Sequence, residues 1–207
     1  MVKPNVGILA LQGAFAAHAA ILESLGCVTQ QVRTVEQLRA VDALVLPGGE
    51  STTMSMLLER CGMLDPLRER AQEGMAIFAT CAGLILLATE ICDGRDDQHA
   101  LGVLDITVAR NGYGRQIASF ETALDVSNLD SPFEAVFIRS PVITRVGSGV
   151  ETLAELDGNP VLCRADAVMA ATFHPELSGD VRLHQHWLSG TIYADYADNR
   201  KFAQQKG

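Results

Sequence analysis

The segment FATCAGLILLA, residues Phe78–Ala88, joins an apolar run to a helix-like run through a cysteine flanked by small residues. The residues before Cys81 suit a buried strand, and those after it suit a helix. A sharp strand-to-helix turn needs small neighbours, and the order small-x-nucleophile-x-Gly at such a turn is the pattern of a nucleophile elbow. A cysteine there lies at a helix N-terminus, which favours thiolate over thiol. Taken alone, these residues fit a nucleophile and a buried structural cysteine equally well.

The first half of the chain repeats this alternation of short apolar runs and helical patterns. NVGILALQG, CVTQQVRT, VDALVLPGG and MAIFATC read as strands, which predicts a parallel sheet covered on both faces by helices. The helix after Cys81 is expected to continue to Ile91, and the helix after Gly49 to be capped by Ser51 or Thr52. The second half consists of short alternating strands, which predict an antiparallel or mixed extension of the sheet. We therefore expect one α/β domain over residues 1–207.

Composition excludes several functional classes. The 207 residues are 48% hydrophobic and 20% charged, as in an ordinary globular protein. The net charge of −9 argues against a nucleic-acid or anionic membrane surface, and no apolar run approaches the roughly 18 residues of a membrane span. Five cysteines without CxxC or zinc-finger spacing predict a reducing cytoplasm and no structural zinc. We also expect no other metal and no cofactor. Apart from Cys81, we expect these cysteines to be packed in the core.

Two further motifs also follow apolar runs. In TFHPEL, His174 and Glu176 are two residues apart, so an extended backbone points both to one side, as a base and its orienting carboxylate require. The alternative is a histidine at a strand end beside a solvated glutamate. In LPGGEST, Gly48 and Gly49 would let backbone N–H groups approach a ligand, as an oxyanion hole requires, although a plain turn also explains them. All three motifs fall at carboxyl ends of predicted strands, where open α/β sheets build their sites.

Together, LALQG, LPGGESTTM, TCAGLILLA, RNGYGRQ, FIRSP and FHPEL resemble the glutaminase subunits of pyridoxal 5′-phosphate synthase, the PdxT family. This family is a branch of the class I, triad-type glutamine amidotransferases. The matches run in order through nearly the whole chain, and GGEST combined with RNGYGRQ and FIRSP points to this branch. The resemblance implies a single-domain, three-layer, flavodoxin-like fold.

The resemblance also implies hydrolysis of L-glutamine to glutamate and ammonia. Cys81 would attack the side-chain amide, His174 would transfer protons, and Glu176 would orient His174. Backbone N–H groups of Gly49 and Ala82 would form the oxyanion hole. The residues implied to line the glutamine site are Gly49, Glu50, Ser51, Arg110, Ile138 and Arg139. Arginines suit the substrate carboxylate, although without the resemblance either arginine would read as a surface ion pair.

By the same resemblance, the ammonia would pass to a separate synthase partner with a (β/α)8-barrel fold, in a hetero-oligomer. Gln12 and Gly13 are candidates for part of the docking surface, with a strand-end turn as the alternative. His18 is expected to be a half-exposed helical histidine.

Two alternatives to this function keep the same fold. One is a glutaminase of another pathway or a γ-glutamyl hydrolase, against which RNGYGRQ and FIRSP argue. The other is a non-catalytic ligand sensor, against which the presence of Cys81, His174 and Glu176 together argues.

Overall fold

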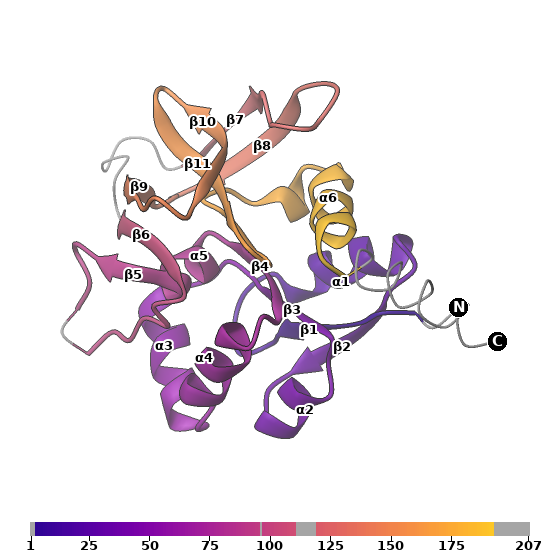
Figure 1. Cartoon of the computed structure of the whole chain (residues 1–207), viewed down its shortest axis with the longest axis vertical. Coiled ribbons are helices and arrows are strands. Elements are labelled where there is room, and N and C mark those ends of the chain that lie inside the picture. Colours follow the sequence, from indigo (N-terminus) through magenta and orange to yellow (C-terminus); the bar gives the residue numbers. More distant parts are fainter. Residues whose placement is uncertain (1–2, 96, 111–118, 193–207) are drawn as a thin grey trace.

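A seven-stranded sheet forms the centre of the computed structural model, which describes residues 3–95, 97–110 and 119–192 (Figure 1). Its strand order is β10-β11-β12-β4-β3-β1-β2. Strands β12, β4, β3, β1 and β2 run parallel, while β10 and β11 extend the sheet in antiparallel pairing. This confirms the predicted parallel sheet with a mixed extension. These strands are β1 (Asn5–Leu9), β2 (Val28–Val32), β3 (Ala43–Leu46), β4 (Ala76–Thr80), β10 (Glu151–Leu156), β11 (Asn159–Ala165) and β12 (Val168–Ala171).

The central strands are apolar on both faces because helices cover both. In β3, Leu44 and Leu46 belong to one buried cluster, whereas Ala43 and Val45 belong to the other. This alternation follows from the period of two along a strand. Helices α3, α4 and α5 supply apolar side chains to the first cluster, and α1 and α6 supply the second. The helices are α1 (Phe15–Ser24), α2 (Val35–Arg39), α3 (Ser51–Arg60), α4 (Leu64–Gln72), α5 (Ala82–Leu87) and α6 (Arg182–Gly190), with a short 3₁₀ helix η1 (Pro175–Leu177).

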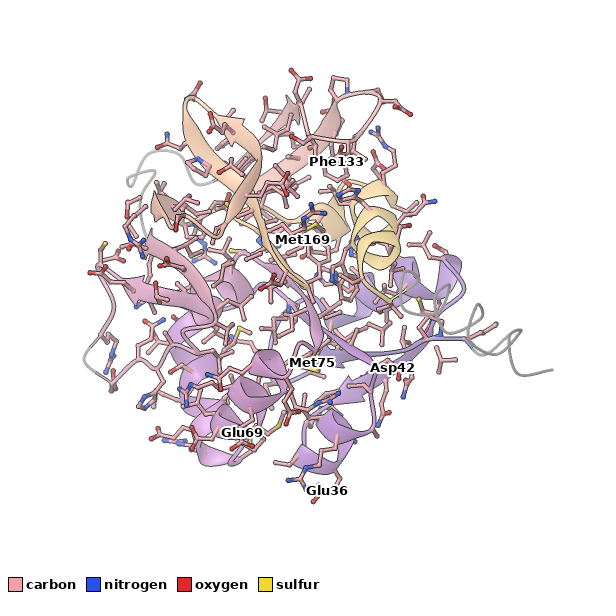
Figure 2. The ribbon with its side chains drawn as sticks, in the orientation of Figure 1. Glu36, Asp42, Glu69, Met75, Phe133 and Met169 are labelled. Atoms are coloured by element: carbon pink, nitrogen blue, oxygen red, sulfur yellow. The ribbon has the colours of Figure 1, made fainter. Side chains whose placement is uncertain are left out.

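The side chains that fill these clusters are drawn in Figure 2, where Met75 belongs to the first cluster and Phe133 and Met169 belong to the second. Within the described ranges, no helix combines the length and the apolar character needed to cross a membrane.

Two smaller sheets complete the second half and include one departure from the sequence prediction. The segment expected to continue the helix to Ile91 leaves it after Leu87, and Ala88–Ile91 is strand β5. Ala88 already has an extended backbone, with ψ 151°, and β5 pairs in parallel with β6. The β-branched residues Thr89 and Ile91 fit this pairing better than a helix. The remaining strands are β6 (Leu104–Ala109), β7 (Ser119–Leu124), β8 (Phe133–Ile138) and β9 (Val142–Val146).

Gly83 sets the close approach of α5 to the sheet. A Cβ atom added at Gly83 would overlap the carbonyl oxygen of Leu46, the last residue of β3. The overlap is with backbone, which cannot swing aside as a flexible side chain could. The helix that begins directly after Cys81 can therefore lie against β3 only because this position has no side chain.

We predict that Gly83→Ala destabilises the protein by about 1–3 kcal/mol, the range for overpacking, although alanine favours helix. Urea unfolding monitored by circular dichroism measures the change. Gly149→Ala is the matched control, because an added Cβ there meets no atom within 4 Å and should change stability by no more than about 0.5 kcal/mol. Equal effects of the two substitutions would contradict the packing argument.

Candidate active site

Cys81 occupies the turn between β4 and α5 in a conformation that L-residues rarely adopt. Its backbone has φ 49° and ψ −106°, and its N–H donates to the carbonyl of Ala171 at 2.8 Å. The side chain is almost buried, with the residue 7% exposed. A non-glycine residue held at positive φ costs free energy of about 1–3 kcal/mol and is typical of functional sites. The strand-to-helix turn therefore lies where the sequence predicted it, and it presents the sulfur at the carboxyl end of β4.

His174 reaches the same end of the sheet from the neighbouring strand. β12 lies beside β4, with Ala171 paired to Thr80, and His174 follows three residues later. The Nδ1 atom of His174 lies 2.8 Å from Oε1 of Glu176, which is itself buried in η1. The predicted base and carboxylate thus meet in a direct hydrogen bond, although Glu176 lies in a 3₁₀ helix and not in the extended backbone that the sequence analysis assumed.

The charges of this cluster follow from its contacts. Burial lowers the pKa of His174, but hydrogen bonds and charge interactions with Cys81 and Glu176 outweigh burial and raise that pKa to about 10. Burial raises the pKa of Glu176, and the hydrogen bond from His174 more than offsets this, so that the Glu176 pKa is lowered overall. At neutral pH the ring is therefore an imidazolium between a carboxylate and the sulfur of Cys81. Such a neighbour stabilises the thiolate, the nucleophilic form of cysteine.

The loop after β3 lies against Cys81 and His174 and forms the third side of the site. A Cβ at Gly48 would overlap the ring of His174 and would lie 3.4 Å from the Cβ of Cys81, so only glycine fits there. Gly13, with φ 97°, lies directly against the Gly48 carbonyl oxygen. Gly49 follows beside the Gln12 side chain, and Ala82 is the first residue of α5. Gln12 and Gly13, predicted to be a docking surface or a turn, therefore support the loop that holds Gly48.

Glu50 and Arg110 are joined in a polar network with Gln98. Glu50 Oε1 lies 3.0 Å from Nη2 of Arg110, and Arg110 Nη1 donates to Gln98 Oε1 at 3.0 Å. Gln98 Nε2 donates in turn to the Ser51 hydroxyl at 3.1 Å. The network thus brings together three of the residues expected to line the glutamine site, and it adds Gln98.

Glu50, rather than Ser51 or Thr52, caps α3. Its carboxylate accepts from the backbone N–H groups of Thr52 and Thr53. Burial raises the pKa of Glu50, but bonds from Thr53 and Thr52 dominate and lower it to about 2. The predicted hydroxyl cap was wrong because Ser51 already lies within the helix and its hydroxyl bonds to Gln98.

Gln98 was missed by the sequence interpretation. It belongs to the polar segment 93–99, which reads as a surface loop and contains no motif that marks a site. In the structure this segment folds back onto α3, where the His99 N–H donates to the Ser55 hydroxyl. Contacts made by a loop across many residues of separation leave no local pattern in the sequence.

Ile138 and Arg139 lie at the end of β8. The carbonyl of Val136 in this strand accepts the backbone N–H of His174 at 2.8 Å, so the strand passes directly beside the triad. Arg139 is exposed and has φ 43°, a positive value that non-glycine residues seldom adopt. The strand thus brings both predicted residues to the His174 side of the site. Residues 111–118 of the RNGYGRQ motif and its surroundings lie outside the described residues.

Two expectations about other residues were wrong. His18 is fully buried, not half-exposed. Cys61 and Cys92 are exposed, whereas Cys27 and Cys163 are buried as expected. The five cysteines form no disulfide with one another, and burial raises the pKa of the Cys163 thiol to about 11, which makes it a poor nucleophile.

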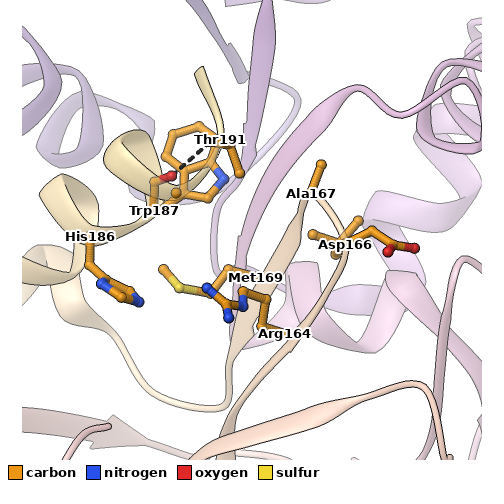
Figure 3. Close-up of a pocket in the computed structure, with 9 residues that line it drawn as sticks. Arg164, Asp166, Ala167, Met169, His186, Trp187 and Thr191 are labelled. Atoms are coloured by element: carbon orange, nitrogen blue, oxygen red, sulfur yellow. Dashed lines mark hydrogen bonds between the residues drawn. The ribbon is translucent and has the colours of Figure 1, made fainter. Parts of the chain in front are cut away.

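One concave site lies away from the triad. The hollow in Figure 3 lies between α6 and the turn that enters β12, and Asp166, Met169, His186 and Trp187 are among its lining residues. This turn is at the opposite end of β12 from His174. In the described part of the chain, no group of three or more His, Cys, Asp or Glu residues is placed to hold a metal ion.

Comparisons with known proteins were consistent across sequence and structure. The model of the SNO glutamine amidotransferase family matches residues 8–192. The chain is 55% identical to the pyridoxal 5′-phosphate synthase subunit PdxT of Herpetosiphon aurantiacus, over 89% of this chain and 98% of that protein. It is 52% identical to the PdxT subunit of Corynebacterium jeikeium, over 88% and 94%.

Among solved structures, a glutamine amidotransferase crystal structure matches with a TM-score of 0.84 and 49% identity, over 89% of this chain and 97% of that one. A putative GMP synthase protein from Thermoplasma acidophilum matches with a TM-score of 0.68 at 16% identity, over 97% of this chain and 99% of that one, which shows a shared fold alone.

The charge arrangement predicts a measurable reactivity. In a Cys61→Ser/Cys92→Ser background, which removes the two exposed thiols, His174→Gln should slow alkylation of Cys81 by iodoacetamide at pH 7 by about 10- to 30-fold. The reason is that the thiolate is the reactive form of cysteine, and His174 is the cation beside the sulfur. Mass spectrometry of the Cys81 peptide against time measures the rate. Thr172→Val, a buried change two residues away, is the control, and equal rates in all three proteins would contradict the imidazolium–thiolate pair.

Proposed function

The chain belongs to the SNO glutamine amidotransferase family, and we propose that it releases ammonia from L-glutamine with Cys81 as the nucleophile. The observation that carries this proposal is the meeting of Cys81, His174 and Glu176 at the carboxyl ends of two adjacent parallel strands. A thiolate beside an imidazolium that is oriented by a carboxylate has the composition needed for acyl transfer.

In the proposed mechanism, the Cys81 sulfur attacks the side-chain amide carbon of glutamine, and the carbonyl electron pair moves to oxygen. Backbone N–H groups of Gly49 and Ala82 stabilise this oxyanion. The imidazolium of His174 gives its proton to the leaving nitrogen, the C–N bond breaks, and ammonia departs from a glutamyl thioester. His174, now neutral, takes a proton from water, whose oxygen attacks the thioester. Glutamate leaves, and the thiolate–imidazolium pair is restored.

The remaining predicted residues recognise the amino-acid end of glutamine. A zwitterionic substrate needs donors for its carboxylate and acceptors for its ammonium group. Arg139 supplies donors from the end of β8, while Arg110 and Glu50 form a charged pair at the side of the Gly49 loop. Gly49, Ser51 and Ile138 complete the lining. Gln98 supports this wall by bonding both Arg110 and Ser51.

The curated relatives are named as subunits of pyridoxal 5′-phosphate synthase. We infer that this chain likewise delivers ammonia to a synthase partner of (β/α)8-barrel type, with Gln12 and Gly13 near the docking surface. Five cysteines that form no disulfide with one another support a reducing compartment, the cytoplasm.

Glutamate release from L-glutamine tests the proposal. The purified chain is assayed alone and mixed with a pyridoxal 5′-phosphate synthase barrel. We expect activity that rises on mixing and falls by at least about 1,000-fold in Cys81→Ala, as for removal of other nucleophiles. Cys163→Ala is the matched control, because this thiol is buried away from the triad and should leave turnover unchanged. Strong activity unaffected by the barrel would point to another pathway, and no activity in either state would favour a ligand sensor.

Substrate recognition gives a separate prediction. Arg110→Ala and Arg139→Ala should each raise the KM for glutamine by about 10-fold or more, the cost of a lost hydrogen bond to a charged group, with a smaller change in kcat. Steady-state kinetics of the assembled enzyme measure both constants. Arg145→Ala, which breaks an exposed pair with Asp105, should change neither. A fall in kcat at constant KM would show that the two arginines do not bind the substrate.

A further inference from the structure

Behind the triad lies a buried pair of histidines that the proposed mechanism does not use. Glu176 Oε1 is occupied by His174, while the buried Oε2 accepts no hydrogen bond from the described residues and lies 3.4 Å from Nε2 of His18. The side chains of Glu176 and His18 are both 0% exposed. On its other side, His18 Nδ1 lies 2.9 Å from Nε2 of His184, which is also fully buried. Helices α1 and α6, which carry these histidines, cover the same face of the central sheet (Figure 1).

The carboxylate determines which ring nitrogens carry protons. An unprotonated His18 Nε2 would place its lone pair 3.4 Å from the lone pairs of Glu176 Oε2, so the carboxylate favours the tautomer with the N–H on Nε2, where the Thr80 hydroxyl can also accept from it. His18 Nδ1 is then an acceptor, and His184 must donate from its own Nε2. The Nδ1 atom of His184 is then left without a proton, and it has no hydrogen-bond partner among the described residues. The result is a chain of donors directed from His184 through His18 to Glu176.

Both histidines are neutral in this arrangement. Burial lowers the pKa of His18 to about 4, against the opposing effect of Glu176, and burial together with His18 lowers the pKa of His184 to about 3. The groups facing His18 are Glu176 from η1, His184 from α6 and the Thr80 hydroxyl from β4, which lies 3.4 Å from Nε2. A neutral donor can therefore stabilise Glu176 over the whole physiological pH range without adding a second positive charge beside His174.

We propose that His18 is a positioning residue of this site, which holds the second oxygen of Glu176 through Nε2–H and is itself oriented by His184. Its effect reaches the reaction through Glu176 and His174, since a carboxylate held at both oxygens keeps the imidazole at a fixed angle to Cys81. This is the role that outer hydrogen-bond partners have in other sites where a carboxylate orients histidine. The inference rests on the proposed function for its meaning in catalysis.

His18→Phe tests the proposal because it keeps a planar ring beside Phe78 but removes the donor. We expect kcat/KM for glutamine to fall by about 10- to 100-fold, mainly through kcat, as for loss of a hydrogen bond to a charged group. The acid limb of the kcat/KM profile should move to higher pH. A hydrogen bond to a carboxylate lowers its pKa, so Glu176 without the His18 donor is protonated more easily. His18→Gln, which keeps an N–H donor, should restore most of the activity and the wild-type acid limb.

Two controls separate positioning from folding and from the proposed function. Leu22→Val, one turn further along α1 in the same buried cluster, perturbs the helix without touching Glu176 and should leave the acid limb in place. The pH dependence of Cys81 alkylation reports on the triad even without turnover, and its acid limb should move in His18→Phe. The inference would be overturned if the acid limbs of both pH profiles were unchanged in His18→Phe. It would also be overturned if His18→Phe and His18→Gln lost equal amounts of kcat/KM. A wild-type protein with the expected alkylation profile but no glutaminase activity would instead overturn the proposed function alone.

Discussion

The site depends on one backbone constraint, the positive φ of Cys81 at the end of β4. A residue held in this conformation turns the chain from strand to helix within one step, and it directs the sulfur out of the sheet edge. The turn is possible only because the surrounding chain accommodates it. Gly83 lets α5 touch the backbone of Leu46, and Gly48 leaves room for the ring of His174 beside the cysteine. The strained backbone of Cys81 is thus held in place by close packing at Gly83 on one side and at Gly48 on the other.

A second level of organisation is electrostatic. The sheet order places β12, β4 and β3 side by side, so the residues that follow them meet at one edge. There a buried carboxylate and a sulfur keep an imidazole protonated, although burial alone would favour its neutral form. Before substrate binds, His174 therefore already carries the proton that the proposed chemistry gives to the leaving nitrogen. The neutral histidines behind Glu176 support this arrangement without disturbing its balance.

Much of this could be predicted from the sequence, for physical reasons that differ between residues. Cys81, His174 and Gly49 each follow a run of buried apolar residues, and the carboxyl ends of parallel strands must meet. What the sequence did not indicate arises from long-range contacts. His18 pairs with residues far along the chain, and the segment carrying Gln98 reads as an ordinary polar loop. Strand β5 likewise forms because a partner strand is present, whereas its local sequence is compatible with a helix.

The central claim is that Cys81 forms a covalent bond to the side-chain carbon of glutamine. Its most direct test is a glutamine analogue that carries a diazoketone in place of the amide, incubated with the protein and followed by peptide mass spectrometry. The account predicts one adduct, on the peptide that contains Cys81, which forms quickly in the wild type and slowly in Glu176→Gln. Labelling of the exposed Cys61 or Cys92 instead, or no labelling at all, would contradict it.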